Sequence, residues 1–300
     1  MVNQENTGLA PTISVIIPTY NYADYICSAI NSVLTQHNDC EIIVIDDGST
    51  DNTRELVSAY NEKVKYVHQD NAGVSAARNH GISLAKGEYL IFLDADDTLL
   101  PDALSILRNN IKFYPDTDCF LSGYQSIDKT GRTKYTPSKP LTESNFDNFR
   151  LFLRKKLGGI KIAAANKRVF ENVKFPETIR NNEDIVLLAQ ILANSKCRTI
   201  DKPIIKMFKH DDSLRHNLET AIDSTHKVAN ELFNPALIPK DIMGLKDEYS
   251  SRVILSRFRA LYLAGQTQQA RKLYHEAIAL FPKHLLLFSY LKKYLKSWFK

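Results

Sequence analysis

The chain carries, at residues 89–97, the stretch Tyr89-Leu90-Ile91-Phe92-Leu93-Asp94-Ala95-Asp96-Asp97. Its five apolar residues predict a buried strand, and three acids follow at the carboxyl end. Because side chains alternate along a strand, we expect Asp94 and Asp96 to face one spot while Ala95 points away. Packing gives no reason for such a cluster. A binding site for a divalent cation that carries a diphosphate would explain the cluster, since Mg²⁺ and Mn²⁺ take carboxylate oxygens and share their coordination shell with substrate phosphates.

Short apolar runs alternate with helical patterns before and through this stretch. Strands are predicted at residues 13–18, 41–45, 64–67 and 89–93, and helices at residues 24–35, about 51–60 and 73–85. This alternation predicts βαβ units, and hence an α/β fold with a mostly parallel sheet whose two faces are both covered by helices. Ligands of such sheets bind outside the carboxyl ends of the strands.

Polar clusters follow three of these strands at their carboxyl ends. They are Pro18-Thr19-Tyr20-Asn21, Asp46-Asp47-Gly48-Ser49 and Asp94-Ala95-Asp96-Asp97. We expect them to converge on one crevice, where the Asp46-Asp47 pair could hydrogen-bond a base or a ribose. A capped strand-to-helix turn is the alternative for that pair.

The stretch 71–79 opens a helix with small residues, so that its partly positive N-terminus can approach a partner closely. Arg78 lies about one turn into this helix. From there it could reach a base or a phosphate, or it could remain a surface residue.

The pattern after residue 115 is more mixed. Strands are predicted at 119–124, 160–165 and 204–209, and a helix at 182–193 begins with Glu183-Asp184. Acids in a first helical turn commonly complement the helix dipole. A transfer site with a metal also needs a base, however, and a carboxylate is the usual choice. His210 could be a further metal ligand.

The charge is unevenly distributed. Residues 271–300 hold seven Lys and Arg against one acid, so the rest of the chain is nearly neutral and no nucleic-acid-binding surface is predicted. Four scattered cysteines indicate neither a zinc site nor a disulfide framework. The polar start lacks the pattern of a signal peptide, and no stretch reaches the ~18 apolar residues of a membrane span. We therefore expect a cytoplasmic protein with reduced thiols.

The sequence from residue 218 onward is helical. Residues 260–282 are similar to one tetratricopeptide helix pair, and a single copy predicts a helical hairpin rather than a solenoid. Residues 285–300 predict a basic amphipathic helix, with Leu287, Phe288, Leu291, Leu295 and Trp298 on one side and Lys292, Lys296 and Lys300 on another. Such a helix either docks on the protein or lies on an anionic membrane. Five lysines and no acid after residue 282 favour the membrane.

Four motifs make the chain similar to family 2 glycosyltransferases of the GT-A fold. In order along the chain they are residues 14–21, 45–51, 71–79 and 87–97. The resemblance is close from residue 12 to about 100 and loose to about 217. It implies inverting transfer from a nucleotide-diphosphate sugar, most often a UDP-sugar, with Mg²⁺ or Mn²⁺.

The resemblance also implies roles for individual residues. Pro18, Thr19 and Tyr20 would line the nucleobase pocket, Asp46 or Asp47 would contact the base, and Arg78 would face the nucleotide. Asp94 would approach the ribose or the metal, Ala95 would lie within the same donor site, and Asp96 would coordinate the metal. Glu183-Asp184 resembles the Glu-Asp pair of the family, which makes Asp184 the candidate base. The Trp-centred motif common before that pair is absent from 160–165.

We therefore predict a lead-in at residues 1–11, a GT-A domain at 12–217 and a helical extension at 218–300. Within the domain, 12–115 would hold the nucleotide-sugar and 116–217 the acceptor. The expected enzyme moves a hexose onto a lipid-linked or surface-polysaccharide acceptor, such as lipopolysaccharide, at the inner membrane face. The alternatives are a nucleotidyltransferase, which would release pyrophosphate rather than UDP or GDP, and a non-catalytic sugar-nucleotide-binding protein.

Overall fold

The computed structural model describes residues 12–36, 40–180, 182–209 and 227–299. The chain divides into two compact units, residues 1–217 and 218–300. The predicted lead-in at 1–11 and the candidate ligand His210 lie outside the described residues.

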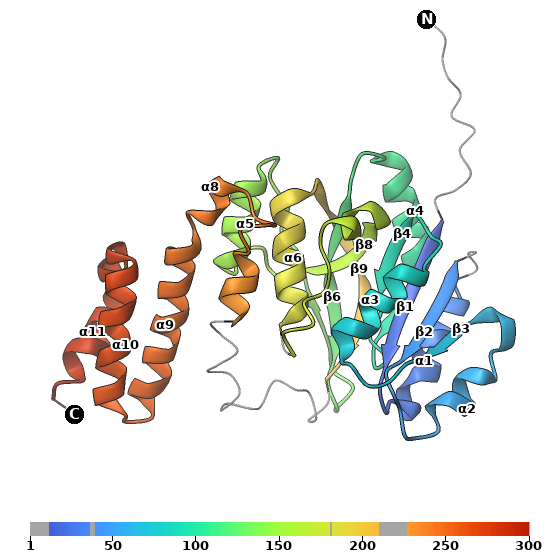
Figure 1. The fold of residues 1–300 in the computed structure, drawn as a ribbon, viewed down its shortest axis with the longest axis horizontal. Helices are drawn as coiled ribbons and strands as arrows, with labels where there is room; N and C mark the ends of the chain where they lie inside the picture. Colours follow the sequence, from blue (N-terminus) through green and yellow to red (C-terminus); the bar gives the residue numbers. More distant parts are fainter. Residues whose placement is uncertain (1–11, 37–39, 181, 210–226, 300) are drawn as a thin grey trace, which may run out of the picture. The chain divides into compact units, whose positions relative to one another are not determined.

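A mixed sheet runs through the first unit (Figure 1). Its first half is parallel, in the order β3 (Lys65–His68), β2 (Glu41–Asp46), β1 (Ile13–Thr19) and β4 (Tyr89–Phe92). The second half continues with β8 (Lys161–Asn166), β6 (Cys119–Ile127), β9 (Cys197–Phe208) and β5 (Thr98–Leu99), while β7 (Thr133–Thr136) pairs with β6. In this half β8 is antiparallel to both β4 and β6, whereas β9 is parallel to β6. The sheet is therefore mixed: the expected parallel arrangement holds throughout the first half, and in the second half only β6 and β9 pair in parallel among the described strands.

Helices cover both faces of this sheet. Alternate residues of β1 show why, since Val15 and Ile17 join one apolar core and Ile16 joins the other. The first core is completed by α1 (Ala23–Leu34) and α4 (Ala103–Phe113). The second is completed by α3 (Val74–Leu84) and α6 (Glu183–Asn194). The shorter helices α2 (Thr53–Ser58) and α5 (Asn145–Leu153) complete the described helices of this unit.

A close approach between α3 and β1 depends on one glycine. A Cβ at Gly81 would lie 2.4 Å from Cγ2 of Ile16, so a larger residue would push the helix off the sheet. The same helix carries Arg78, and its distance from the sheet therefore fixes where that side chain can reach.

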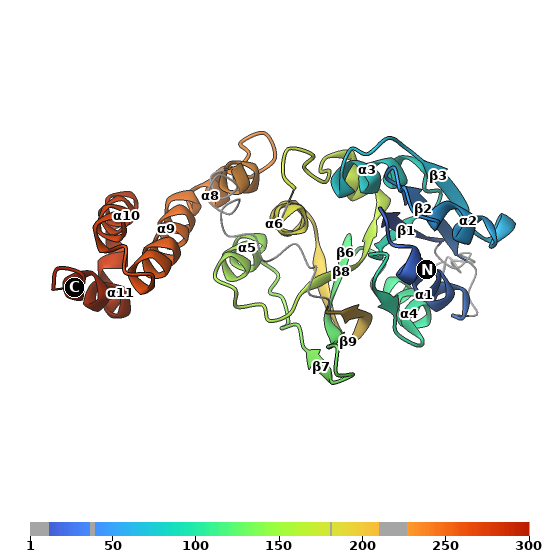
Figure 2. The same ribbon diagram turned by 90° about the horizontal axis from the view of Figure 1, so that it is seen from below.

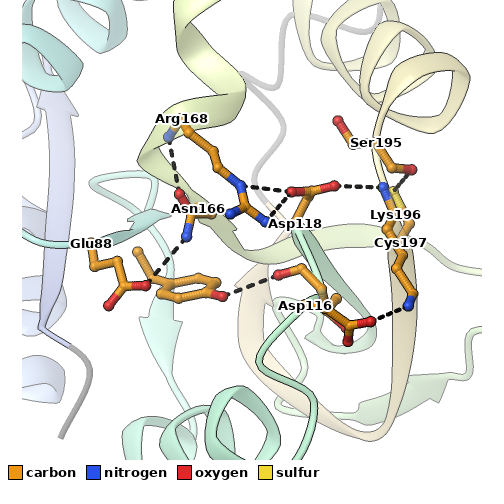
Figure 3. Close-up of polar contacts among 10 residues, drawn as sticks. Glu88, Asp116, Asp118, Asn166, Arg168, Ser195, Lys196 and Cys197 are labelled. Carbon is orange, nitrogen blue, oxygen red and sulfur yellow. Dashed lines mark hydrogen bonds and ion pairs between the residues drawn. The ribbon is translucent and has the colours of Figure 1, made fainter. Parts of the chain in front are cut away.

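A polar network joins three strands at the end of β4 opposite to Asp94 (Figure 3). Asp118, just before β6, accepts hydrogen bonds from Nε of Arg168 at 2.9 Å and from the backbone N–H of Lys196 at 2.7 Å. Asn166 donates to Glu88 at 3.5 Å, and Lys196 forms an ion pair with Asp116. The network holds β6, β8 and β9 in register at this end, and we regard it as structural.

The second unit contains α8 (Lys240–Met243), α9 (Lys246–Leu263), α10 (Thr267–Leu280) and α11 (Phe288–Lys296). The helices α9 and α10 form an antiparallel hairpin, and Figure 2 shows α11 beside it. Its buried core includes Leu255, Phe258 and Tyr274. No helix among the described residues is apolar enough over a sufficient length to cross a bilayer.

The predicted amphipathic tail is divided between two environments. Leu287 and Leu291 pack against the α9–α10 core, together with Tyr290 and Tyr294. By contrast, the exposed fractions of three apolar side chains of the tail are large: 75% for Phe288, 54% for Leu295 and 92% for Phe299. Trp298 is also exposed, although the guanidinium of Arg271 lies 4.4 Å from its ring centroid. The helix thus docks on the protein through one face and leaves an aromatic face exposed.

Candidate active site

The carboxyl ends of β1 and β2 are joined directly. The backbone N–H of Asp47 donates to the carbonyl of Thr19 at 2.9 Å, and the N–H of Thr50 donates to Oδ1 of Asn21 at 2.7 Å. Asn21 adopts the left-handed conformation with φ 56°, which turns the chain sharply after β1. Two of the three polar clusters therefore meet, as the alternation of strands and helices predicts.

Asp46 and Asp47 are buried and their carboxylates accept hydrogen bonds from the protein. Asp46 accepts from the N–H of Ser49 at 2.8 Å and from the hydroxyl of Tyr66 at 2.6 Å. Asp47 accepts from the N–H groups of Ala72 at 2.9 Å and Gly73 at 2.8 Å, and from the amide of Gln69. A negative charge at the N-terminus of α3 is favourable. Asp47 thus anchors the loop that leads into α3, and a contact between either acid and a base stays a prediction.

Thr19 and Tyr20 differ in exposure. Oγ1 of Thr19 is buried, and no described residue hydrogen-bonds to it. The side chain of Tyr20 is 46% exposed just beyond the strand. Pro18 is buried within β1. The first cluster therefore offers one buried hydroxyl and one accessible ring to a ligand.

Arg78 links the strand end after β4 to the start of α6. Its Nη2 lies 2.7 Å from Oδ1 of Asp94 and its Nη1 lies 2.8 Å from Oε1 of Glu183, while its guanidinium lies 5.0 Å from the ring centroid of Phe175. Burial alone would lower the pKa of Arg78, but the charges of Asp94 and Glu183 raise it above its ordinary value. Both terminal nitrogens of Arg78 are therefore engaged within the protein, while its Nε is buried and no described residue hydrogen-bonds to it. A nucleotide contact by Arg78 stays a prediction.

The three acids after β4 lie on a turn rather than on a strand. The N–H of Asp97 donates to the carbonyl of Asp94 at 3.0 Å, which makes Ala95 and Asp96 the central residues of a β-turn. The expected alternation of Asp94 and Asp96 along a strand is therefore wrong, because β4 ends at Phe92. Asp94 and Asp96 remain partly exposed, while Asp97 is buried. Burial, with the charges of Asp94 and Asp96, raises the pKa of Asp97 to about 8.

A pocket of about 60 Å³ lies between this turn and α6. Its polar lining consists of Arg78, Asp94, Asp97, Lys161 and Asp184. Its apolar walls are Phe92, Ile160, Ile162, Phe175, Leu188 and Ile205. The pocket thus brings together three of the predicted site residues, Arg78, Asp94 and Asp184, from segments far apart in the sequence. The other predicted positions, Pro18, Thr19, Tyr20, Asp46, Asp47, Ala95 and Asp96, do not line it.

The two acids at the start of α6 have different surroundings. Glu183 binds Arg78 and its side chain is 12% exposed, whereas Asp184 is exposed and lines the pocket. Asn182, with φ 72° in the left-handed region, forces the chain to turn just before the helix. Of the two carboxylates, Asp184 is therefore the one that can accept a proton from a ligand in the pocket.

The acids of the turn suit a hard divalent cation, although the described residues include no group of three or more His, Cys, Asp or Glu side chains placed to bind one. Mg²⁺ is usually held by one or two carboxylates together with substrate phosphates. Oδ1 of Asp94 is bound by Arg78, which leaves Oδ2 of Asp94 as the oxygen that could face a cation, and the partly exposed Asp96 lies two residues further along the turn. The donor set fits Mg²⁺ or Mn²⁺ in the presence of a diphosphate.

Sequence reasoning missed Lys161 and the partners of Arg78. Lys161 falls in the predicted strand at 160–165, where a lysine is commonly a solvated edge residue. The antiparallel pairing of β4 with β8 puts the first residue of β8 beside the end of β4, and this pairing is not readable from either strand alone. Phe175, which packs on Arg78, lies in a segment with no regular pattern.

Residues 14–173 match the model of one protein family, described as glycosyl transferase family 2. The chain belongs to this family. An uncharacterized glycosyltransferase of Rickettsia felis is 36% identical over 200 residues, which are 65% of this chain and 32% of that protein. One of Rickettsia typhi is 30% identical over 214 residues, which are 69% of this chain and 67% of that protein. The chain thus spans about a third of the length of the first of these relatives.

Solved structures show the same fold. The structure of S. aureus TarS residues 1–349 in complex with UDP matches with a TM-score of 0.67 and 21% identity, over 95% of this chain and 88% of that one. The complex of the same protein with UDP-GlcNAc matches with a TM-score of 0.68, over 95% and 89%. This member of glycosyl transferase family 2 therefore has the GT-A fold with C-terminal helices.

Proposed function

We propose that this family 2 glycosyltransferase transfers one sugar, with inversion, from a UDP-sugar to a lipid-linked or surface-polysaccharide acceptor. The observation that carries the proposal is the position of Asp184, which lines the pocket beside Asp94 while its neighbour Glu183 is held by Arg78. An exposed carboxylate beside a diphosphate-binding turn is what an inverting transfer requires.

Asp184 would act as the base. As an acceptor hydroxyl attacks the anomeric carbon, its proton passes to the Asp184 carboxylate and the new C–O bond forms. The bond from the anomeric carbon to the diphosphate breaks on the opposite face, and its electron pair leaves with the diphosphate. Arg78 and Glu183 hold the turn and α6 at a constant separation, so that the base and the donor stay aligned.

Asp94 and Asp96 would hold Mg²⁺ or Mn²⁺ together with the donor. The ion would supply Lewis-acid stabilisation of the charge on the departing diphosphate. The preference for UDP is supported by the fold shared with TarS, whose structures contain UDP and UDP-GlcNAc. Thr19, Tyr20, Asp46 and Asp47 would face the nucleoside from the ends of β1 and β2.

We further propose that the exposed face of α11 attaches the enzyme to the anionic inner face of a membrane, where a lipid-linked acceptor would lie. Phe288 and Leu295 are seven positions apart, about two helical turns, so they lie along one side of α11. The exposed Phe299 follows shortly after the helix ends at Lys296. Lys292 and Lys296 are exposed within the same stretch. Aromatic side chains beside lysines are typical of helices that lie in the membrane interface.

The test is a screen of UDP-glucose, UDP-galactose, UDP-GlcNAc and GDP-mannose with Mn²⁺, read by thermal stabilisation and by the nucleotide released. Release of UDP or GDP supports transfer, whereas pyrophosphate would indicate a nucleotidyltransferase. Asp184→Asn should lower turnover by about 10²–10⁴-fold and leave donor affinity nearly unchanged. Normal turnover by Asp184→Asn, or an equal loss in affinity, would exclude Asp184 as the base.

A further inference from the structure

Lys161 brings a cation into the pocket from the strand beside the acidic turn. In the antiparallel pairing of β4 and β8, Tyr89 lies opposite Asn166 and Leu90 opposite Ala165. Because the two strands are antiparallel, the end of β4 that leads to Asp94 lies on the same side of the sheet edge as Lys161, the first residue of β8. The pocket lining includes both residues, which agrees with that placement.

The two cationic side chains of the pocket, Arg78 and Lys161, differ in whether they have partners within the protein. Arg78 is bound by Asp94 and Glu183, whereas the side chain of Lys161 makes no hydrogen bond or ion pair with the residues that the structure describes. Its charge acts at longer range: it helps to lower the pKa of Asp94, and it offsets part of the rise that burial causes in the pKa of Asp97. Lys161 is partly buried in the pocket wall, and its ammonium keeps three hydrogen-bond donors.

A partly buried ammonium among carboxylates gains most from a ligand that adds negative charge. The pocket already places Asp94 and Asp184 around the reacting centre, and their carboxylates would repel a diphosphate. A cation on the β8 side would offset that repulsion and attract the phosphate oxygens. As the bond to the anomeric carbon breaks, charge grows on the departing diphosphate, and a donor already in place stabilises it without reorganisation.

On the basis of the proposed function, we infer that Lys161 is a further catalytic residue of this enzyme, which binds the diphosphate of the donor from the β8 side and stabilises its charge as it leaves. The metal would face the same diphosphate from the turn that contains Asp96. Lys161 and the turn would then hold the leaving group between them, while Asp184 serves the acceptor.

The test compares Lys161→Met, which keeps an unbranched stem and removes the charge, with Lys161→Arg, which keeps the charge. Lys174→Met is the matched control, because Lys174 is exposed and lies outside the pocket. The affinities of UDP and uridine are measured by calorimetry with Mn²⁺, and kcat and KM are measured with the donor found in the screen. Melting temperatures report on folding.

We expect Lys161→Met to lower the affinity for UDP by about 10-fold, to leave the affinity for uridine unchanged and to lower kcat by about 10²-fold. Lys161→Arg should recover most of the UDP affinity and most of kcat. Lys174→Met should have the same UDP affinity and kcat as the wild type. If Lys161→Met leaves UDP affinity and kcat unchanged while the wild type binds UDP, this inference is wrong and the proposed function stands. A higher KM for the acceptor with normal UDP binding would also overturn it.

A purely structural role for Lys161 predicts a different result. Lys161→Met would then lower the melting temperature and weaken the binding of UDP and of uridine alike, because the pocket itself would be disturbed. That outcome also overturns the inference. If the wild-type chain binds no nucleoside diphosphate at all, the proposed function fails first and the role of Lys161 fails with it.

Discussion

Arg78 and Glu183 are 105 positions apart in the sequence, yet Nη1 of Arg78 lies 2.8 Å from Oε1 of Glu183. The pair joins α3 to the first turn of α6, and the same guanidinium binds Asp94 after β4. Three segments around the pocket therefore share one cation.

We predict that Arg78→Met lowers the free energy of unfolding by about 3–5 kcal/mol, because removing one partner leaves a buried charge unpaired. Glu183, with a side chain only 12% exposed, should account for most of this loss, and Asp94, at 37%, for less. The measurement is urea unfolding. Adding Glu183→Gln to Arg78→Met should restore part of the lost stability, since it removes the unpaired charge. Strictly additive effects of the two substitutions would show that the ion pair contributes nothing.

The sequence predicts the strand ends well because an apolar run and its polar successor are local features. The meeting of the clusters after β1 and β2 follows from strand order alone, and Asp47 and Thr19 do lie together. Local patterns could not predict the Arg78–Glu183 pair, because nothing in either helix indicates which neighbour it will face. The prediction that Asp96 alternates with Asp94 along a strand is wrong for another reason. A hydrogen bond from Asp97 to Asp94 ends the strand earlier than the apolar run suggests.

Asp47 is predicted to support the site through the loop before α3. Asp47→Ala would leave the N–H groups of Ala72 and Gly73 without their acceptor, and a hydrogen bond to a charged group contributes about 1.5–3 kcal/mol. Gly73 has φ 94°, a conformation that glycine adopts without steric cost. We expect faster hydrogen exchange at residues 72–78 and a lower melting temperature. Asp47→Asn keeps one carbonyl oxygen, so its melting temperature should fall less. Unchanged hydrogen exchange at residues 72–78 in Asp47→Ala would contradict the anchoring role.

Asp96 is predicted to matter for the metal rather than for the fold. It occupies a partly exposed turn position, so Asp96→Ala should keep the melting temperature near that of the wild type. Loss of a central charge contact typically lowers the rate by about 10²–10³-fold. The affinity for Mn²⁺ in the presence of UDP, measured by calorimetry or paramagnetic resonance, should fall in parallel. Full activity of Asp96→Ala in the presence of a chelator would exclude a metal role for this residue.

The last prediction concerns the exposed face of α11. Deletion of residues 285–300 would be ambiguous, because Leu287 and Leu291 pack on the α9–α10 hairpin and their removal would destabilise the unit itself. The sharper variant replaces Phe288, Leu295 and Phe299 with Ser, since these side chains are 75%, 54% and 92% exposed. It should leave the melting temperature unchanged and release the protein from liposomes that contain anionic lipid. Leu291→Ser is the matched control, and it should lower the melting temperature.

Salt separates the contribution of the lysines from that of the aromatic side chains. Each lysine near an anionic surface contributes about 1 kcal/mol, and this attraction is screened by salt. Lys292→Gln with Lys296→Gln should therefore weaken liposome binding at low salt and make the remaining binding less sensitive to salt. If the wild-type chain ignores anionic liposomes, or if the triple Ser variant binds them equally well, the exposed face serves another contact. Transfer to a soluble acceptor should continue in the triple variant, because the pocket around Asp184 lies entirely within residues 1–217.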